Sequence, residues 1–232
     1  MLTVARERPV DPTTLAVLTL VDRISRELAL DYFVIGAMAE ELLLYGVFGL
    51  DTGRATLDVD LAVALDTWQQ FEVVKARLVE TGAFTPAREP HRLFHRAGMG
   101  QKASPLDLLP FGGIEQRPNE IAWPPDLSII MNVAGYREAL AASQEVEVQQ
   151  DLVVRVASLP WLAILKLFAW ADRGTENPKD ALDLTTLLRR YGAAGNEDRL
   201  FAEEIGLLEA LNYDLDLASP RLLGKDAARV TA

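Results

Sequence analysis

The sequence of 232 residues contains no cysteine and only two histidines. Without thiols the chain can form neither disulfides nor thiolate nucleophiles nor zinc–thiolate clusters. Two histidines are too few for a metal site built of histidine alone. Carboxylates are therefore the side chains that remain for holding a metal ion.

Basic residues are also scarce, with 23 Lys and Arg against 34 Asp and Glu, and the formal net charge is -11. A field of this sign repels a nucleic-acid backbone or an anionic membrane surface, so any nucleic acid must be held by local contacts. No segment approaches the roughly 20 apolar residues of a membrane span. Residues 1–8 lack the apolar run of a signal peptide. We therefore expect a soluble cytoplasmic protein with no membrane partner.

Half of the residues are hydrophobic, which suffices for one compact domain with a helical extension. Their spacing predicts an α/β (α+β) fold in residues 1–157, with a mixed β-sheet flanked by helices, and a helical region in residues 158–232 that packs on it. The expected helices cover residues 12–30, 37–45, 67–80, 161–171 and 178–191. The expected strands cover residues 32–35, 57–64, 93–95, 106–109, 146–148 and 152–156, the last two as a hairpin.

Two aspartates lie in the expected strand 57–64, where apolar residues alternate with others. The alternation places the apolar residues from Leu57 to Val63 on one face and Asp58 and Asp60 on the other. At about 6 to 7 Å and an effective dielectric of about 20, the two carboxylates repel by on the order of 2 to 3 kcal/mol unless a cation or a proton intervenes. Asp107, between two leucines, joins them if its strand is a neighbour. Three carboxylates then predict a site for hard divalent cations.

The order of residues along the chain resembles that of the DNA polymerase beta-type nucleotidyltransferases. The similar motifs are Gly36-Ala37, then Arg54-x-Thr56-x-Asp58-x-Asp60, then Asp107. Leu106–Glu115, and Lys166 followed by Arg173 and Lys179-Asp180-x-x-Asp183, are similar to the AbiEii/AbiGii-type branch of abortive-infection toxins. The resemblance runs from about residue 30 to 192, and this ordered set is far more specific than an Asp-x-Asp pair alone.

The resemblance implies a metal-dependent nucleotidyltransferase that moves a nucleoside monophosphate from a nucleoside triphosphate (NTP) to a hydroxyl acceptor. The acceptor is an RNA or tRNA end or a protein, and the setting is a toxin–antitoxin system with an antitoxin partner. By this resemblance, Asp58 and Asp60 would hold two Mg²⁺ or Mn²⁺ ions. Asp107 would hold the ion near the attacking hydroxyl and is the nearest candidate base. Two ions suit phosphoryl transfer, which depends on alignment and charge neutralisation.

The same resemblance assigns a nucleotide-binding role to residues outside the carboxylate group. The turn at Gly36 and Ala37 lets backbone N–H groups approach the triphosphate. Lys166 and Arg173 are two helical turns apart and share a face that neutralises the triphosphate, and Lys179 extends this patch.

Each feature also has a purely structural explanation. A solvated edge strand explains Asp58 and Asp60, a solvent-facing helix stripe explains Lys166 and Arg173, and an ordinary strand-to-helix turn explains Gly36. The alternative function is therefore a catalytically weak nucleotide-binding or interaction module that retains the fold. It is favoured by residues 37–39, which supply no hydroxyl where the family turn usually carries a second glycine, serine or threonine.

The start of the expected helix 178–191 is explained by capping. Asn177 caps it, Pro178 suits its first position, and Asp180 lies near the positive end of its dipole. Asp183 is expected to pair with Lys179 one turn away.

The histidines and the helical tryptophans receive no chemical role. His91 and His95 are expected at the surface, whereas Trp161 and Trp170 lie in an apolar helical run and are expected in the core. Arg54 and Thr56 are expected to be loop residues that orient the site.

Overall fold

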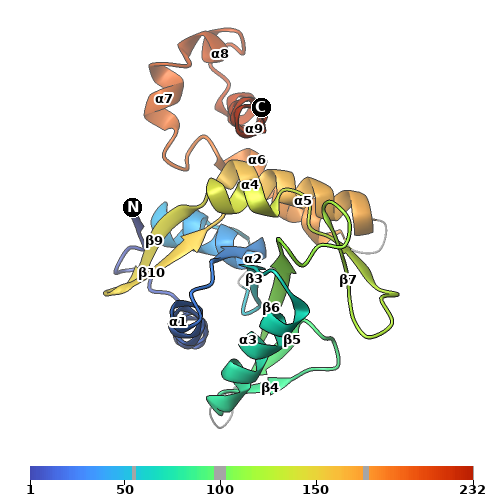
Figure 1. The fold of residues 1–232 in the computed structure, drawn as a ribbon. Helices are drawn as coiled ribbons and strands as arrows, with labels where there is room; N and C mark the ends of the chain where they lie inside the picture. The colour runs from blue at the N-terminus through green and yellow to red at the C-terminus, as the bar shows by residue number, and fades with distance from the viewer. Residues whose placement is uncertain (54–55, 97–102, 175–177, 232) are drawn as a thin grey trace.

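The computed structural model describes residues 1–53, 56–96, 103–174 and 178–231. In these residues an eight-stranded mixed sheet has the order β1-β9-β10-β2-β3-β6-β5-β4 (Figure 1). A separate hairpin is formed by β7 (Glu120–Ala122) and β8 (Ile130–Asn132). The sheet strands are β1 (Leu2–Thr3), β2 (Tyr32–Ile35), β3 (Val59–Ala64), β4 (Phe84–Pro86), β5 (Arg92–His95), β6 (Ser104–Phe111), β9 (Gln144–Gln149) and β10 (Leu152–Val156). The mixed sheet and the hairpin of β9 and β10 confirm two sequence predictions.

The helices of the first part begin where local sequence satisfies their free N–H groups. Asp11 accepts hydrogen bonds from Thr13 and Thr14 at the start of α1 (Pro12–Glu27), and Thr67 forms a capping box with Gln70 at the start of α3 (Trp68–Glu80). Next to β2, α2 (Gly36–Glu40) continues into a π-helical segment (Glu41–Val47), and α4 (Tyr136–Ala141) comes later. The helix expected over residues 37–45 is therefore longer and partly π-helical.

One expected strand starts later than predicted. β3 begins at Val59 because its pairing with β6 begins there, opposite Leu106. Leu57 lies before the strand and is 43% exposed, so its expected place on the core face is wrong. The Ser104 hydroxyl donates to the Leu57 carbonyl, which holds this segment beside β6.

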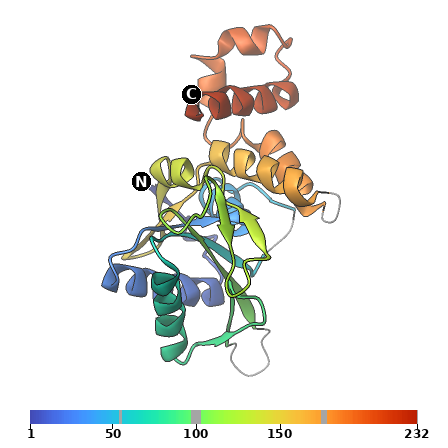
Figure 2. The same cartoon turned by 45° about the vertical axis from the view of Figure 1, so that its right-hand side comes forward.

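The C-terminal helices are α5 (Leu159–Arg173), α6 (Lys179–Arg190), α7 (Glu197–Phe201), α8 (Ile205–Glu209) and α9 (Leu215–Val230). Figures 1 and 2 show α7, α8 and α9 at one end of the molecule, beyond α5 and α6. α5 contacts α2, and one cluster of buried hydrophobic residues runs from Val4 to Leu223. A division near residue 157 stays a prediction. The structure assigns the N-cap of α6 to Pro178, and Asn177 lies outside the described residues.

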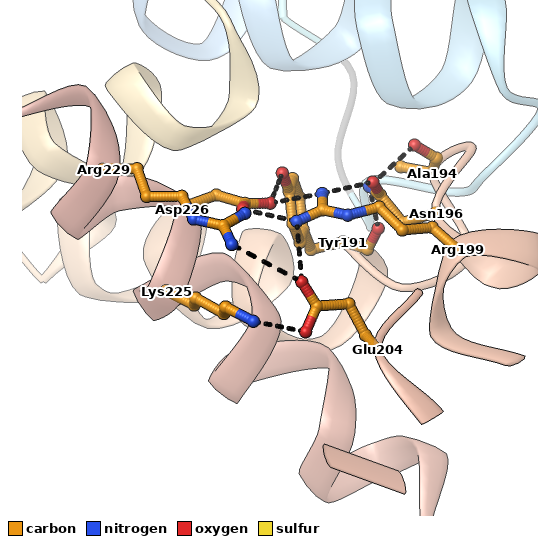
Figure 3. A network of polar contacts seen from close by, with 8 residues as sticks. All are labelled: Tyr191, Ala194, Asn196, Arg199, Glu204, Lys225, Asp226 and Arg229. Atoms are coloured by element: carbon orange, nitrogen blue, oxygen red, sulfur yellow. Dashed lines mark hydrogen bonds and ion pairs between the residues drawn. The ribbon is translucent and has the colours of Figure 1, made fainter. Parts of the chain in front are cut away.

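A polar network holds α9 against the chain that follows α6 (Figure 3). Arg199 donates to both carboxylate oxygens of Asp226, at 2.7 and 2.6 Å, and the Tyr191 hydroxyl donates to the same carboxylate at 2.7 Å. Glu204 accepts from Lys225. Burial opposes ionisation of Asp226, but these donors outweigh it and hold the pKa of that carboxyl below its ordinary value. The network therefore fastens the tail through ionised carboxylates.

Two further observations concern surfaces. Trp161 is buried as expected, but Trp170 is 50% exposed, because its side of α5 faces away from the core; its expected core position is wrong. Among the described helices, none is both long and apolar enough to cross a membrane.

Candidate active site

The pairing of β3 with β6 brings two of the predicted carboxylates together. The strands run parallel, and Asp60 lies directly opposite Asp107 in their register. Both side chains leave the sheet on the face opposite the buried Val59, Leu61 and Leu108, as the alternating pattern predicts.

Gly36 lies against Asp60 from the other neighbouring strand. Ile35, the last residue of β2, is opposite Asp60 in the antiparallel register, and Gly36 then turns with a φ of 68° into α2. A Cβ built on Gly36 would lie 2.3 Å from Asp60 Oδ2, so only glycine leaves room for this carboxylate. Ala37 follows in the first turn of α2.

Asp58 is placed differently from the other two carboxylates. It precedes β3 and is exposed. Its N–H donates to the Thr56 hydroxyl at 3.2 Å, and the Thr56 N–H donates to Glu41 at 2.9 Å, so Thr56 orients this segment. Arg54 lies outside the described residues. The charge of Asp58 acts on both Asp60 and Arg92, which places it within electrostatic reach of the pair.

Asp107 has a cationic partner that sequence analysis did not assign. Arg92 lies opposite it in the antiparallel register of β5 and β6. Its Nε and Nη2 each donate to one carboxylate oxygen at 2.7 Å, which is a bidentate pair. The pairing of Arg92 with Asp107 could not be predicted from the sequence, because the sequence of residues 92–107 does not determine the register of the two strands.

Asp60 is a buried carboxyl with a raised pKa. Burial first, and the neighbouring charge of Asp107 second, raise its pKa to about 6, and Asp58 adds to this while Lys166 opposes it. A carboxyl with such a pKa lacks a sufficient counter-charge. A cation bound beside it would supply one.

The cations predicted to bind the triphosphate face Asp60 from α5, but they already have carboxylate partners. Lys166 is buried and donates to Asp180 at 3.2 Å and to Asp183 at 2.5 Å. Arg173 donates to Asp180 at 2.8 and 3.3 Å, although its side chain is 58% exposed. Burial opposes ionisation of Asp180, but these two cations outweigh it and hold its pKa below the ordinary value.

Two expectations about this group are corrected. Asp180 is more than a helix-start charge, because it accepts from both cations, and Asp183 pairs with Lys166 rather than only with Lys179 one turn away. Two antiparallel helices in contact offer such partners across sequence separations that a single-helix rule does not cover. Lys179 is exposed at the start of α6 and is not among the described residues that line the cavity.

A cavity of about 340 Å³ joins the two halves of the site. Asp60, Asp107 and Gly36 lie on one side, and Lys166 and Arg173 lie on the other. The β7–β8 hairpin and α5 add an apolar wall that consists of Ile129, Ile130, Met131, Leu165 and Phe168.

Among the residues that line this cavity, His91 and Tyr136 received no role from the sequence. His91 is half-buried beside Trp123, with ring centroids 5.5 Å apart, so its expected surface position is wrong. Burial lowers its pKa, which makes the ring neutral at pH 7. Burial likewise raises the pKa of Tyr136, so its phenol stays protonated.

The donor set fits a hard divalent cation, because Asp60 and Asp107 offer carboxylate oxygens side by side and the nearby cations do not fully offset the charge of Asp60. Arg92 now takes both oxygens of Asp107, so a cation would share or replace that partner. Within the described residues, no three His, Cys, Asp or Glu side chains gather closely enough to hold one ion. Convergence of Asp58 on the other two carboxylates stays a prediction.

Comparison with known proteins decides the family. The family model of the nucleotidyl transferase AbiEii toxin, of type IV toxin–antitoxin systems, matches residues 20–219. The chain belongs to this family. It is an AbiEii-type nucleotidyltransferase, as its motifs predict. No curated protein matches the chain.

Three solved structures are similar to this chain, and one of them has a TM-score above 0.5. The crystal structure of an antigenic nucleotidyltransferase-like protein from Paracoccidioides brasiliensis is 14% identical, with a TM-score of 0.52 over 89% of this chain and 93% of that one. The antibiotic-resistance factor ANT(2'')-Ia is 16% identical, with a TM-score of 0.47 over 88% and 99%. The Thermotoga maritima CCA-adding enzyme complexed with tRNA is 16% identical, with a TM-score of 0.31 over 97% and 53%. The first of these supports a shared nucleotidyltransferase fold.

Proposed function

We propose that this AbiEii-family chain transfers a nucleoside monophosphate from an NTP to a hydroxyl on an RNA or tRNA end or on a protein, and that it does so as the toxin of a toxin–antitoxin pair. The observation that carries the proposal is the register of Asp60 with Asp107 at one side of a cavity whose other side holds Lys166 and Arg173. Paired carboxylates facing cations are what phosphoryl transfer from a triphosphate needs.

In the proposed reaction the acceptor oxygen forms a bond to the α-phosphorus of the NTP. The bond from that phosphorus to the bridging oxygen breaks, and pyrophosphate leaves. The proton of the hydroxyl passes to a carboxylate, for which Asp107 is the candidate. Asp60 and Asp107, with Asp58 beside them, would hold Mg²⁺ or Mn²⁺, which neutralises charge on the entering and leaving oxygens. Gly36 keeps the space that the Asp60 carboxylate occupies.

The nucleotide itself is expected to span the cavity. Arg173 has N–H groups beyond the two it gives to Asp180, and these can meet phosphate oxygens. The apolar wall of Ile129, Ile130 and Phe168 offers a surface for a base or for the acceptor. Lys166 contributes through Asp180 and Asp183, which it holds in place.

Incubation with each labelled NTP, Mg²⁺ or Mn²⁺, and either total RNA or cell lysate tests the proposal. Asp60→Asn keeps the shape of the side chain and removes its charge, so label transfer is expected to fall at least about a hundredfold. Asp151→Asn is a matched control, because Asp151 is exposed at the β9–β10 turn with a φ of 65°, which Asn tolerates. Transfer that survives Asp60→Asn at the wild-type rate contradicts the proposal.

Thermal melting distinguishes the alternative of a weak binding module. Binding stabilises a protein by about 2.7 kcal/mol at a hundredfold excess of ligand over its dissociation constant. A melting shift with NTP and Mg²⁺ but no label transfer to RNA or protein would favour the module. Growth arrest on expression, absent with Asp60→Asn, tests the toxin role.

A further inference from the structure

Tyr136 presents a fixed ring to the cavity from the start of α4. The ring makes edge-to-face contacts with Phe33 of β2 and Phe111 of β6, at centroid distances of 6.4 and 5.8 Å and interplanar angles of 82° and 78°. Both partners are fully buried. Gly135, with a φ of 80°, lets α4 start close to α5, since a Cβ there would lie 3.0 Å from Trp161. The phenol is therefore positioned before any ligand arrives.

Charged groups from both sides of the site lie within electrostatic reach of this phenol. Tyr136 lines the cavity together with Asp60 and Arg173, and the charges of Asp60, Arg173 and Asp180 all act on it. Across residues 1–53, 56–96, 103–174 and 178–231, the hydroxyl makes no hydrogen bond. A phenol that lines the cavity within electrostatic reach of a carboxylate and a guanidinium, and whose hydroxyl has no hydrogen-bond partner among the described residues, is available to a ligand.

The two cations opposite the carboxylates already donate hydrogen bonds to protein carboxylates, so a bound triphosphate requires further donors. Lys166 gives hydrogen bonds to Asp180 and Asp183, and Arg173 gives two of its own to Asp180. Residues 37–39, beside the turn at Gly36, carry no hydroxyl. A neutral donor adds a hydrogen bond to an anion without another charge in the cavity.

We propose that the Tyr136 hydroxyl donates a hydrogen bond to a phosphate oxygen of the bound nucleotide, and so supplies the hydroxyl that the turn at Gly36 lacks. The inference rests on the proposed function, because it assumes that an NTP occupies the cavity. Phosphate fits better than base, because the apolar wall of Ile129, Ile130 and Phe168 provides a separate surface for the base. Tyr136 is thus a substrate-binding residue specific to the triphosphate.

Tyr136→Phe tests this, because it removes the hydroxyl and keeps the ring that packs on Phe33 and Phe111. Calorimetric titration with Mg²⁺ compares inorganic tripolyphosphate, the NTP that the wild type binds most tightly, and the matching nucleoside. The dissociation constants of tripolyphosphate and of the NTP are expected to rise about tenfold, as for one lost hydrogen bond to a charged group. The constant for the nucleoside is expected to stay unchanged. Tyr213→Phe is the matched control, because Tyr213 is 57% exposed on the distant tail.

Each other outcome has a distinct meaning. If the wild type binds neither NTP nor tripolyphosphate, the proposed function fails together with this inference. If the wild type binds both and Tyr136→Phe binds them within about twofold of it, only the inference fails. If the variant loses NTP but keeps tripolyphosphate, the hydroxyl contacts ribose or base and the phosphate assignment is overturned. The unliganded melting temperature checks the fold: a variant that melts earlier is titrated again well below its transition, where the same three outcomes apply.

Discussion

Replacing Lys166 with methionine separates a structural from a substrate-binding role for this amine. Lys166 is 8% exposed, and its two partners, Asp180 and Asp183, have side chains only 3% and 6% exposed. Methionine keeps most of the side-chain volume but leaves Asp183 without this cation. Removing one partner of a buried ion pair costs about 3 to 5 kcal/mol, because a charge stays buried without compensation.

Urea unfolding and thermal melting at pH 7 measure this cost. For a chain of this size each kcal/mol shifts the melting temperature by about 2 to 4 °C, so we expect a fall of about 6 to 20 °C for Lys166→Met. The double variant Lys166→Met/Asp183→Asn should recover part of the loss at pH 7.

Arg173→Met is the control on the same helix. Its side chain is 58% exposed, and Asp180 keeps Lys166 as a partner, so we expect a loss of at most about 1 kcal/mol. A Lys166→Met protein as stable as the wild type at pH 7, but unable to bind NTP, would refute the reasoning. The amine would then serve the substrate and not the contact of α5 with α6.

The other predictions concern the carboxylate side. In urea unfolding, Gly36→Ala is expected to lower the free energy of unfolding by about 1 to 2 kcal/mol, because alanine is strained at a left-handed φ, and to lower it further because the new Cβ displaces Asp60. Gly82→Ala is the control: its φ is 74° and the space around its Cβ is open, so only the backbone strain is expected. Arg92→Ala frees both oxygens of Asp107, so Mn²⁺ affinity measured by electron paramagnetic resonance should rise; weaker binding would show that the guanidinium orients the ligand. The pKa of Asp60 lies at about 6 against an ordinary 3.8, so protonated Asp60 stabilises the metal-free fold at low pH and this contribution is lost as the pH rises through about 6. Asp60→Asn should therefore exceed the wild type in stability by up to about 3 kcal/mol at pH 8 and match it near pH 4, as measured by urea unfolding.

The face on which Asp60 and Asp107 lie could be predicted from the sequence, because the side chains of a strand alternate with a period of two. Val59 and Leu61 are fully buried, as that alternation requires. The pattern failed at Leu57, which is apolar and yet lies before the strand, because a strand starts where its pairing with a neighbouring strand starts, here at Val59 opposite Leu106. A pattern in one segment carries no information on where its hydrogen bonds to the neighbouring segment begin.

Pairing between strands and between helices lay outside what the sequence could predict. The opposition of Arg92 and Asp107 is a matter of register between β5 and β6. The bond from Lys166 to Asp183 spans 17 residues and depends on the contact of α5 with α6. Tyr136 escaped notice for the same reason, since neither Phe33 nor Phe111 is near it in the chain. The residue types of the site were predictable, whereas the partners that set their charge were not.

The carboxylate partners of the cations in the site determine how it can attract a triphosphate. Among the described residues that line the cavity, four are aspartates and only two, Lys166 and Arg173, are cations. Both cations are already paired with carboxylates, and Arg92 is committed to Asp107. A bare triphosphate would therefore enter a cavity whose net charge repels it. Since Asp60 is itself short of a counter-charge, a divalent ion brought in with the nucleotide would relieve both repulsions at once, and nucleotide affinity should depend on that ion more steeply than the sequence motif of lysine and arginine suggests.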